Sequence, residues 1–326
     1  MFQINKSNTY LNGFNLYSKV TYEKLGRFKL VAWLLISFLA MVLQIVPSLL
    51  ISFVIGAIIG VYAIVTGNIS ILEGQLYSNS AMMSWISLVL DTGSVILFFI
   101  FYTRVIEKRP FATIGLNQEN KLKKYIKGAL VAIGMQLFYF VAIIAFGWGE
   151  VVREPIYATS GIGTSAIPYV LLFLVGFMIQ GASEEVVVRG WMMPVLCRYY
   201  KVPIAIIVSS LFFSFLHMGN PNVSDLALVN LALYGIFAAL YAINDGGLWG
   251  IFAQHSVWNW FMGNVLGLPV SGMIIGNASI IETKLTGPDF ITGGSFGPEG
   301  GILVTLIELI GIVYLCYSLR KKYSSD

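Results

Sequence analysis

Charge is scarce in this sequence. Only 11% of the 326 residues are Asp, Glu, Lys or Arg, whereas an ordinary soluble domain has roughly 25%. A large soluble globular protein is therefore excluded. The two cysteines, Cys197 and Cys316, are too few for a disulfide framework and lack the spacing of metal ligands. The net charge of +4 comes from clusters beside apolar runs, which favours orientation in a bilayer over nucleic-acid binding.

Apolar residues, by contrast, make up 57% of the chain. Runs of about 18 or more apolar residues are long enough to cross a membrane as helices. The sequence therefore predicts an all-α fold, a polytopic transmembrane helix bundle of about eight spans. The expected spans are roughly residues 28–66, 81–103, 127–148, 168–196, 203–218, 227–243, 247–266 and 300–318.

The first apolar run, 28–66, is nearly twice as long as a bilayer of about 30 Å requires. One long bent helix or two short ones would both fit, and Pro47 offers a kink or a break. A single crossing places almost all Lys and Arg residues in loops on one side, with only Arg153 and Lys284 opposite. The positive-inside rule then favours eight spans with both termini in the cytoplasm; two crossings remain the alternative.

These spans divide the chain into five parts. We expect a cytoplasmic N-terminal segment, N-terminal transmembrane helices, a catalytic core, an extracytoplasmic Gly-rich loop, and a last transmembrane helix with a basic tail. Their ranges are 1–27, 28–160, 161–266, 267–299 and 300–326.

Three ionisable residues lie together inside the fourth run, at Glu184, Glu185 and Arg189. Each charge at the centre of a membrane helix costs roughly 2.5–3.5 kcal/mol, so such residues are usually paired or functional. Glu185 and Arg189 are four residues apart in the order that favours an ion pair on a helix. No charged residue within one turn can neutralise Glu184, so its partner must come from another helix.

The only two histidines, His217 and His255, also lie in apolar segments, and Asn259 follows His255 by one helical turn. Glu184 and His217 are nearly equidistant from the turn around Arg198 to Pro203, so an antiparallel hairpin places them at similar depth. A buried acid, two imidazoles and an amide form a cluster that can activate water.

These residues carry a family resemblance. Glu-Glu-x-x-x-Arg, Phe-x-x-x-His and His-x-x-x-Asn, on successive spans over about 168–265, resemble the CPBP group of intramembrane peptidases. That group includes type II CAAX prenyl endopeptidases and bacterial abortive-infection and bacteriocin-immunity proteins. The resemblance implies that Glu184 activates water with help from His217, and that His255 and Asn259 stabilise the oxyanion. Glu185 and Arg189 would support the site.

The cofactor is left open by the sequence. A metal-free Glu/His mechanism is favoured, and the common zinc helix signature His-Glu-x-x-His is absent from the sequence. The alternative is a metallopeptidase in which Glu184, His217 and His255 bind zinc or another divalent metal, because two His and one Glu match some catalytic zinc sites.

The expected function is hydrolysis of peptide bonds in a membrane-associated protein or peptide, with or without a lipid anchor, in the membrane of a bacterial cell. The alternative is a non-proteolytic scaffold or regulator that uses the same cluster to bind a partner membrane protein. A transporter is less favoured because no inverted repeat with matched broken helices is evident. The oligomeric state is not readable from the sequence.

Overall fold

A computed structural model describes residues 10, 29–67, 81–158, 160–276 and 278–323. Over these residues the chain is an all-α bundle, as predicted from the sequence. Of the expected N-terminal segment 1–27, only Tyr10 is among the described residues. The principal helices are α2 (Lys29–Thr66), α4 (Ala81–Phe101), α5 (Lys121–Ala145), α6 (Ile167–Glu185), α7 (Met193–Tyr199), α8 (Val202–Leu216), α9 (Asp225–Asp245), α10 (Trp249–Trp260) and α12 (Ile302–Tyr323).

Each expected span coincides with a helix, and six helices in the described part of the chain are long and apolar enough to cross a membrane. The protein is therefore an integral membrane protein. The other two spans are shorter, because α8 has 15 residues and α10 has 12, whereas a crossing needs about 20. A π-helical segment, Phe261–Val265, extends α10.

Two further π-helical segments continue membrane helices: Tyr102–Ile106 follows α4, and Val186–Met192 joins α6 to α7. Sequence patterning alone does not reveal these wider turns, because they keep the apolar character of the helices they extend. Segments of this kind are frequent at functional sites.

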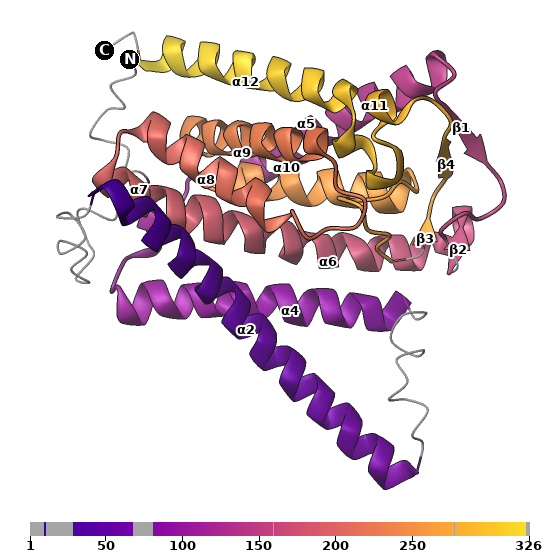
Figure 1. Ribbon diagram of the computed structural model, residues 1–326, viewed down its shortest axis with the longest axis horizontal. Coiled ribbons are helices and arrows are strands. Elements are labelled where there is room, and N and C mark those ends of the chain that lie inside the picture. The colour runs from indigo at the N-terminus through magenta and orange to yellow at the C-terminus, as the bar shows by residue number, and fades with distance from the viewer. Residues whose placement is uncertain (1–9, 11–28, 68–80, 159, 277, 324–326) are drawn as a thin grey trace.

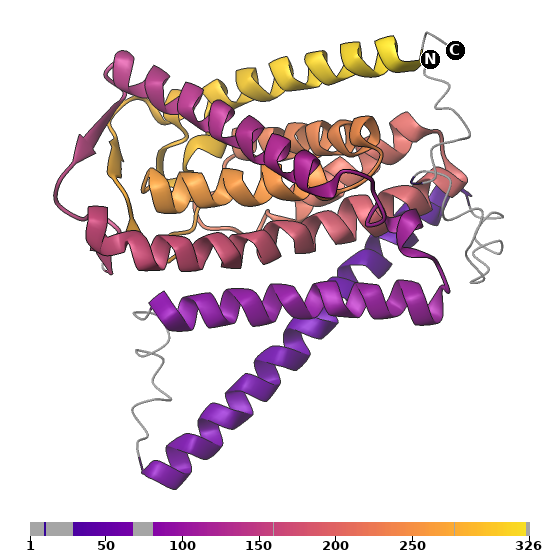
Figure 2. The same ribbon diagram turned by 180° about the vertical axis from the view of Figure 1, so that it is seen from behind.

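Helix α2 is continuous, with Pro47 inside it, which favours one long helix over two short ones for residues 28–66. It crosses α4 obliquely, and its C-terminal half diverges from the bundle (Figures 1 and 2). Apolar side chains in that half, including Phe53 and Ile64, are largely exposed. An apolar surface around a whole helix suits contact with lipid.

Helix α5 begins at Lys121 rather than near residue 127 as expected from the hydrophobic run. Asn120, with φ at 53°, precedes the helix. The extra first turns carry three lysines, Lys121, Lys123 and Lys124, whose long side chains can reach the interface while the helix continues. The hydrophobic pattern therefore predicted the membrane-spanning part of α5 but not its basic first turns.

The segment 267–299 is tied to the connection between α5 and α6 by two short strand pairs at one end of the bundle (Figure 1). Strand β1 (Gly149–Val152) pairs antiparallel with β4 (Glu282–Leu285), and β2 (Gly161–Ile162) pairs parallel with β3 (Ala278–Ser279). The helical bundle is therefore bridged by backbone hydrogen bonds at this end. Helix α12 lies on the opposite side of the central helices from α4 (Figures 1 and 2).

Small residues let the central helices approach closely, as is common between membrane helices. A Cβ atom added to Gly128 of α5 would lie 1.9 Å from the backbone oxygen of Gly250 in α10. One added to Gly181 of α6 would lie 2.8 Å from the backbone nitrogen of Ser256 in α10. Helix α10, which carries His255, therefore packs between α5 and α6 at distances that only glycine permits.

A Gly128→Ala variant should be destabilised by about 1–3 kcal/mol, because the backbone of α10 must move to admit the methyl group. Gly134→Ala is the matched control on the same helix, since nothing lies within 4 Å of its added Cβ and alanine is the better helix former. Thermal unfolding of both variants in a mild detergent measures the difference. Equal unfolding temperatures would contradict the close approach of α5 and α10.

Candidate active site

Glu184 and Glu185 end helix α6, and Arg189 lies in the π-helical segment that follows. The predicted ion pair is confirmed: Nη1 of Arg189 lies 3.0 Å from Oε1 of Glu185, and both side chains are fully buried. Nη2 of Arg189 donates to the carbonyl of Gly235 in α9 at 3.2 Å. Its guanidinium also stacks over the ring of Phe213, 4.7 Å from the centroid. Arg189 therefore links α6, α8 and α9 behind the site.

The backbone of the π-helical segment makes one further contact. The hydroxyl of Tyr10 donates a hydrogen bond to the carbonyl oxygen of Arg189. Tyr10 is itself buried, at 2% exposure. A residue far away in the sequence thus anchors the turn that carries the buried arginine.

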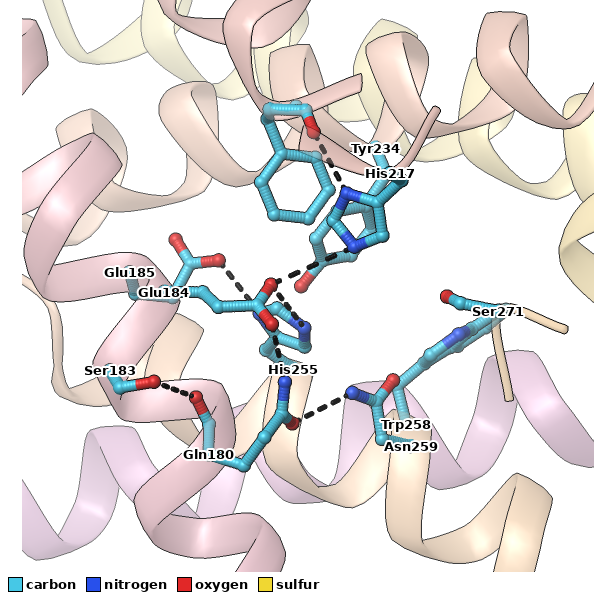
Figure 3. A network of polar contacts seen from close by, with 12 residues as sticks. Gln180, Ser183, Glu184, Glu185, His217, Tyr234, His255, Trp258, Asn259 and Ser271 are labelled. Carbon is cyan, nitrogen blue, oxygen red and sulfur yellow. Dashed lines mark hydrogen bonds and ion pairs between the residues drawn. The ribbon is translucent and has the colours of Figure 1, made fainter. Parts of the chain in front are cut away.

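His255 is oriented by Glu185. Its Nδ1 lies 2.8 Å from Oε1 of Glu185, and because a carboxylate can only accept, Nδ1 carries the hydrogen. The edge of the Tyr234 ring packs against the imidazole at 5.1 Å between centroids. These contacts leave Nε2 of His255 directed towards Glu184 (Figure 3).

His217 immediately follows α8 and is oriented by backbone. Its Nδ1 lies 2.8 Å from the carbonyl oxygen of Phe213, so this nitrogen again is the donor. The ring lies against that of Phe213, with centroids 4.7 Å apart. Nε2 of His217 is therefore also free to face Glu184.

Both imidazoles, one following α8 and one on α10, lie close to a single atom of α6, Oε2 of Glu184. It lies 4.0 Å from Nε2 of His217 and 3.8 Å from Nε2 of His255, and no protein group hydrogen-bonds to it among the described residues. Figure 3 shows both imidazoles turned towards this carboxylate. The hairpin argument from the sequence thus placed Glu184 and His217 at matching depth.

Gln180 is the residue that sequence reasoning missed. Its Nε2 donates to Oε1 of Glu184 at 2.5 Å, and its Oε1 accepts from Nδ2 of Asn259 at 3.0 Å. Asn259 therefore reaches Glu184 through Gln180 rather than directly (Figure 3). The available signal was spacing, since Gln180 precedes Glu184 by one helical turn.

A cavity of about 160 Å³ opens beside Glu184. The side chain of Glu184 is 21% exposed and that of His217 is 14% exposed, whereas Glu185 is fully buried. The wall also includes Gln44 of α2 and Met273 of the 267–299 segment. Water can therefore approach Glu184, while Glu185 is shielded.

Three side chains at the site could in principle donate to a metal ion. Glu184, His217 and His255 supply suitable atoms, and both imidazoles have Nδ1 engaged as zinc-bound histidines usually do. Tetrahedral zinc with bonds near 2.0–2.1 Å brings neighbouring ligand atoms to about 3.3 Å, closer than the 3.8 and 4.0 Å found here. Within the described ranges, no group of three or more His, Cys, Asp or Glu side chains is arranged to hold a metal. The donors as placed do not fit a metal site.

The Gly-x-Ser-x-Gly motif of serine hydrolases occurs once in the sequence, from Gly293 to Gly297. A nucleophile elbow joins a strand to a helix, whereas Gly294–Phe296 is a single 3₁₀ turn that follows the short helix α11 (Asp289–Thr292). Both histidines of the chain lie at Glu184. Ser295 therefore has no histidine to activate it.

A buried acid and two imidazoles from separate helices therefore form a candidate hydrolytic site inside the bundle. Residues 166–261 match the family model described as Type II CAAX prenyl endopeptidase Rce1-like, and the match includes Glu184, His217, His255 and Asn259. The match supports the resemblance of residues 166–261 to the CPBP group of intramembrane peptidases. No curated protein and no solved structure matches it. Helices α2, α4, α5 and α12 lie outside the matched range.

Proposed function

We propose that the protein hydrolyses peptide bonds of a membrane-associated protein or peptide with a water molecule activated by Glu184. The observation that carries this proposal is the position of Glu184 Oε2, within 4.0 Å of both imidazole Nε2 atoms and beside a cavity. These separations are too long for direct hydrogen bonds and suit a bridging water. Glu184 acts as the general base.

The roles of His217 and His255 follow from the number of hydrogen bonds that a water molecule can make. A water molecule has two hydrogens, which it donates to Oε2 of Glu184 and Nε2 of His217. Its oxygen accepts a hydrogen bond from Nε2 of His255 if that ring is doubly protonated. Two carboxylates, Glu184 and Glu185, face His255, so a positive charge on this ring is favoured.

Attack by the water forms a C–O bond to the substrate carbonyl carbon while Glu184 takes the proton. The negative oxygen of the tetrahedral intermediate is stabilised by N–H groups of His255 and Asn259. Asn259 keeps one N–H for this role because its amide donates only one bond to Gln180. The C–N bond then breaks, and the proton held by Glu184 or His217 passes to the leaving amine.

Glu185 and Arg189 do not touch the reacting atoms in this scheme. Glu185 fixes the orientation and charge of His255, and Arg189 compensates the buried charge of Glu185. They are positioning residues.

Both termini are assigned to the cytoplasm because the basic loops lie on that side. We assign the protein to a bacterial cell membrane and to maturation of, or immunity against, membrane-active peptides. The substrate is a peptide or protein, with or without a lipid anchor.

The experiment that tests this function compares peptides released from membranes that contain the wild type or Glu184→Gln at equal levels. We expect a set of new peptide termini that occurs only with the wild type. Identical peptide profiles, together with full complementation of a wild-type phenotype by Glu184→Gln, would favour the non-proteolytic scaffold.

Metal dependence gives a separate prediction. Because the donors do not fit a metal site, incubation with a strong chelator should leave at least about 80% of the turnover. An enzyme that depends on its metal would lose far more, because an impaired metal site typically reduces activity roughly tenfold or more. The measurement is cleavage of a substrate peptide from that profile before and after dialysis against the chelator. Loss of turnover that zinc restores would assign Glu184, His217 and His255 as ligands instead.

A further inference from the structure

A second cavity lies on the far side of the bundle from α2 and is unconnected to the proposed peptidase chemistry. It is a groove of about 520 Å³ between α5, α9 and α12. Helix α12 packs mainly along α9 and runs separately from α5 (Figures 1 and 2). Side chains that line the groove are strongly exposed, including Leu130, Phe138, Ile310 and Tyr314. Exposed apolar surface between membrane-crossing helices faces lipid rather than water.

The length of the groove matches one leaflet. Along α5 its lining runs from Lys127 to Phe138, which is roughly 16 Å at 1.5 Å per residue. Half of a hydrocarbon core of about 30 Å is close to 15 Å. A single acyl chain that starts at the membrane surface would therefore extend along the groove and end near the bilayer centre.

The groove is chemically different at its two ends. Among the described residues that line it, Lys127 is the one charged side chain, and it lies at the surface end beside Asn244. Lys124 donates to the carbonyl of Asp245 at 2.7 Å, and Lys322 donates to that of Asn244 at 2.8 Å. The ends of α5, α9 and α12 thus meet at this point.

Positive charge is in excess there. The carboxylate of Asp245 interacts electrostatically with Lys124, Lys127 and Lys322, and the last turn of α12 adds Arg320 and Lys321. Glu119, which interacts electrostatically with Lys124, is a second acid, and the basic side chains outnumber these two carboxylates. Basic pockets between membrane helices at the cytoplasmic surface attract anionic lipid headgroups.

We infer that this groove binds one anionic phospholipid, with an acyl chain between α5 and α12 and its phosphate at Lys127. The lipid fills the space that separates α12 from α5. It therefore joins α12 to the helices that hold His255, because α5 packs closely on α10 at Gly128.

Titration of purified protein with phosphatidylglycerol or phosphatidylcholine, followed by native mass spectrometry, tests this inference. The wild type should retain one phosphatidylglycerol at least fivefold more tightly than phosphatidylcholine. Lys127→Gln should bind phosphatidylglycerol roughly fivefold more weakly, as expected for about 1 kcal/mol per surface lysine. The matched control is Lys123→Gln on the same helix, which does not line the groove.

A second variant tests the acyl chain. Gly134 lines the groove and has open space around it, so Gly134→Leu should fold and occlude the groove. It should lose binding of phosphatidylglycerol at least tenfold, whereas Val141→Leu, exposed on α5 outside the groove, should not. Equal binding of the two lipids, or undiminished binding by both Lys127→Gln and Gly134→Leu, would overturn the proposal. Peptide cleavage is measured in parallel, so that failure here is separable from failure at Glu184.

Discussion

A Glu184→Gln variant should insert and fold like the wild type and should lose peptide cleavage by at least about 10³-fold, within the range that general bases contribute. The amide keeps the shape of the side chain and can still interact with Gln180. It cannot take a proton from water, however, so the nucleophile is no longer formed. The measurement is single-turnover cleavage by purified protein, with thermal unfolding recorded on the same sample.

Two comparisons make this result specific. Glu150→Gln is the control for the same chemical change, because Glu150 is 54% exposed in a surface pair with Lys284 and should keep full activity. His217→Ala should also abolish cleavage while the protein stays inserted. Turnover by Glu184→Gln or His217→Ala at the wild-type rate would refute the assigned base.

An Arg189→Met variant should be destabilised by about 3 kcal/mol, at the lower end of the range for a broken buried pair. The substitution leaves the carboxylate of Glu185 fully buried without its counter-ion. The loss stays at the lower end because His255 keeps its hydrogen bond to Glu185. Unfolding in detergent, followed by tryptophan fluorescence, measures the change.

Companion variants separate charge from packing. Arg189→Lys keeps the charge but loses the fork that reaches Gly235, so its loss of stability should be smaller. The double variant Glu185→Gln/Arg189→Met should recover part of the stability, because no buried charge is left unpaired. It should not recover cleavage, since the orientation and charge of His255 depend on the Glu185 carboxylate. An Arg189→Met protein as stable as the wild type would contradict this account.

Much of the fold was predictable from hydrophobicity, because membrane helices must be long and apolar to satisfy their backbone groups in lipid. The pairing of Glu185 with Arg189 followed from helical spacing, and the meeting of Glu184 with His217 followed from the length of the hairpin. Both are local consequences of helix geometry. In the described part of the chain six helices are long enough to span, whereas α8 and α10 lie at the expected positions but fall short of a full crossing.

Contacts between distant segments could not be predicted. Nothing in the spacing indicated that Tyr10 would hydrogen-bond the backbone of Arg189. The hydrogen bond from His255 to Glu185 rather than Glu184 depends on how α6 and α10 are rotated against each other. The bridge through Gln180 was hidden because an uncharged amide does not stand out among helix residues. Each of these contacts depends on packing that apolar patterning does not encode.

The wall of the catalytic cavity has a consequence for specificity. Gln44 and Met273 line the cavity together with Glu184, yet neither belongs to the matched range 166–261. On the proposed function, part of the surface that contacts a bound peptide is therefore carried by stretches of chain outside the one that holds the hydrolytic groups. Exchanging α2 and the 267–299 segment for those of a relative would redirect the enzyme towards another peptide without rebuilding its reaction centre.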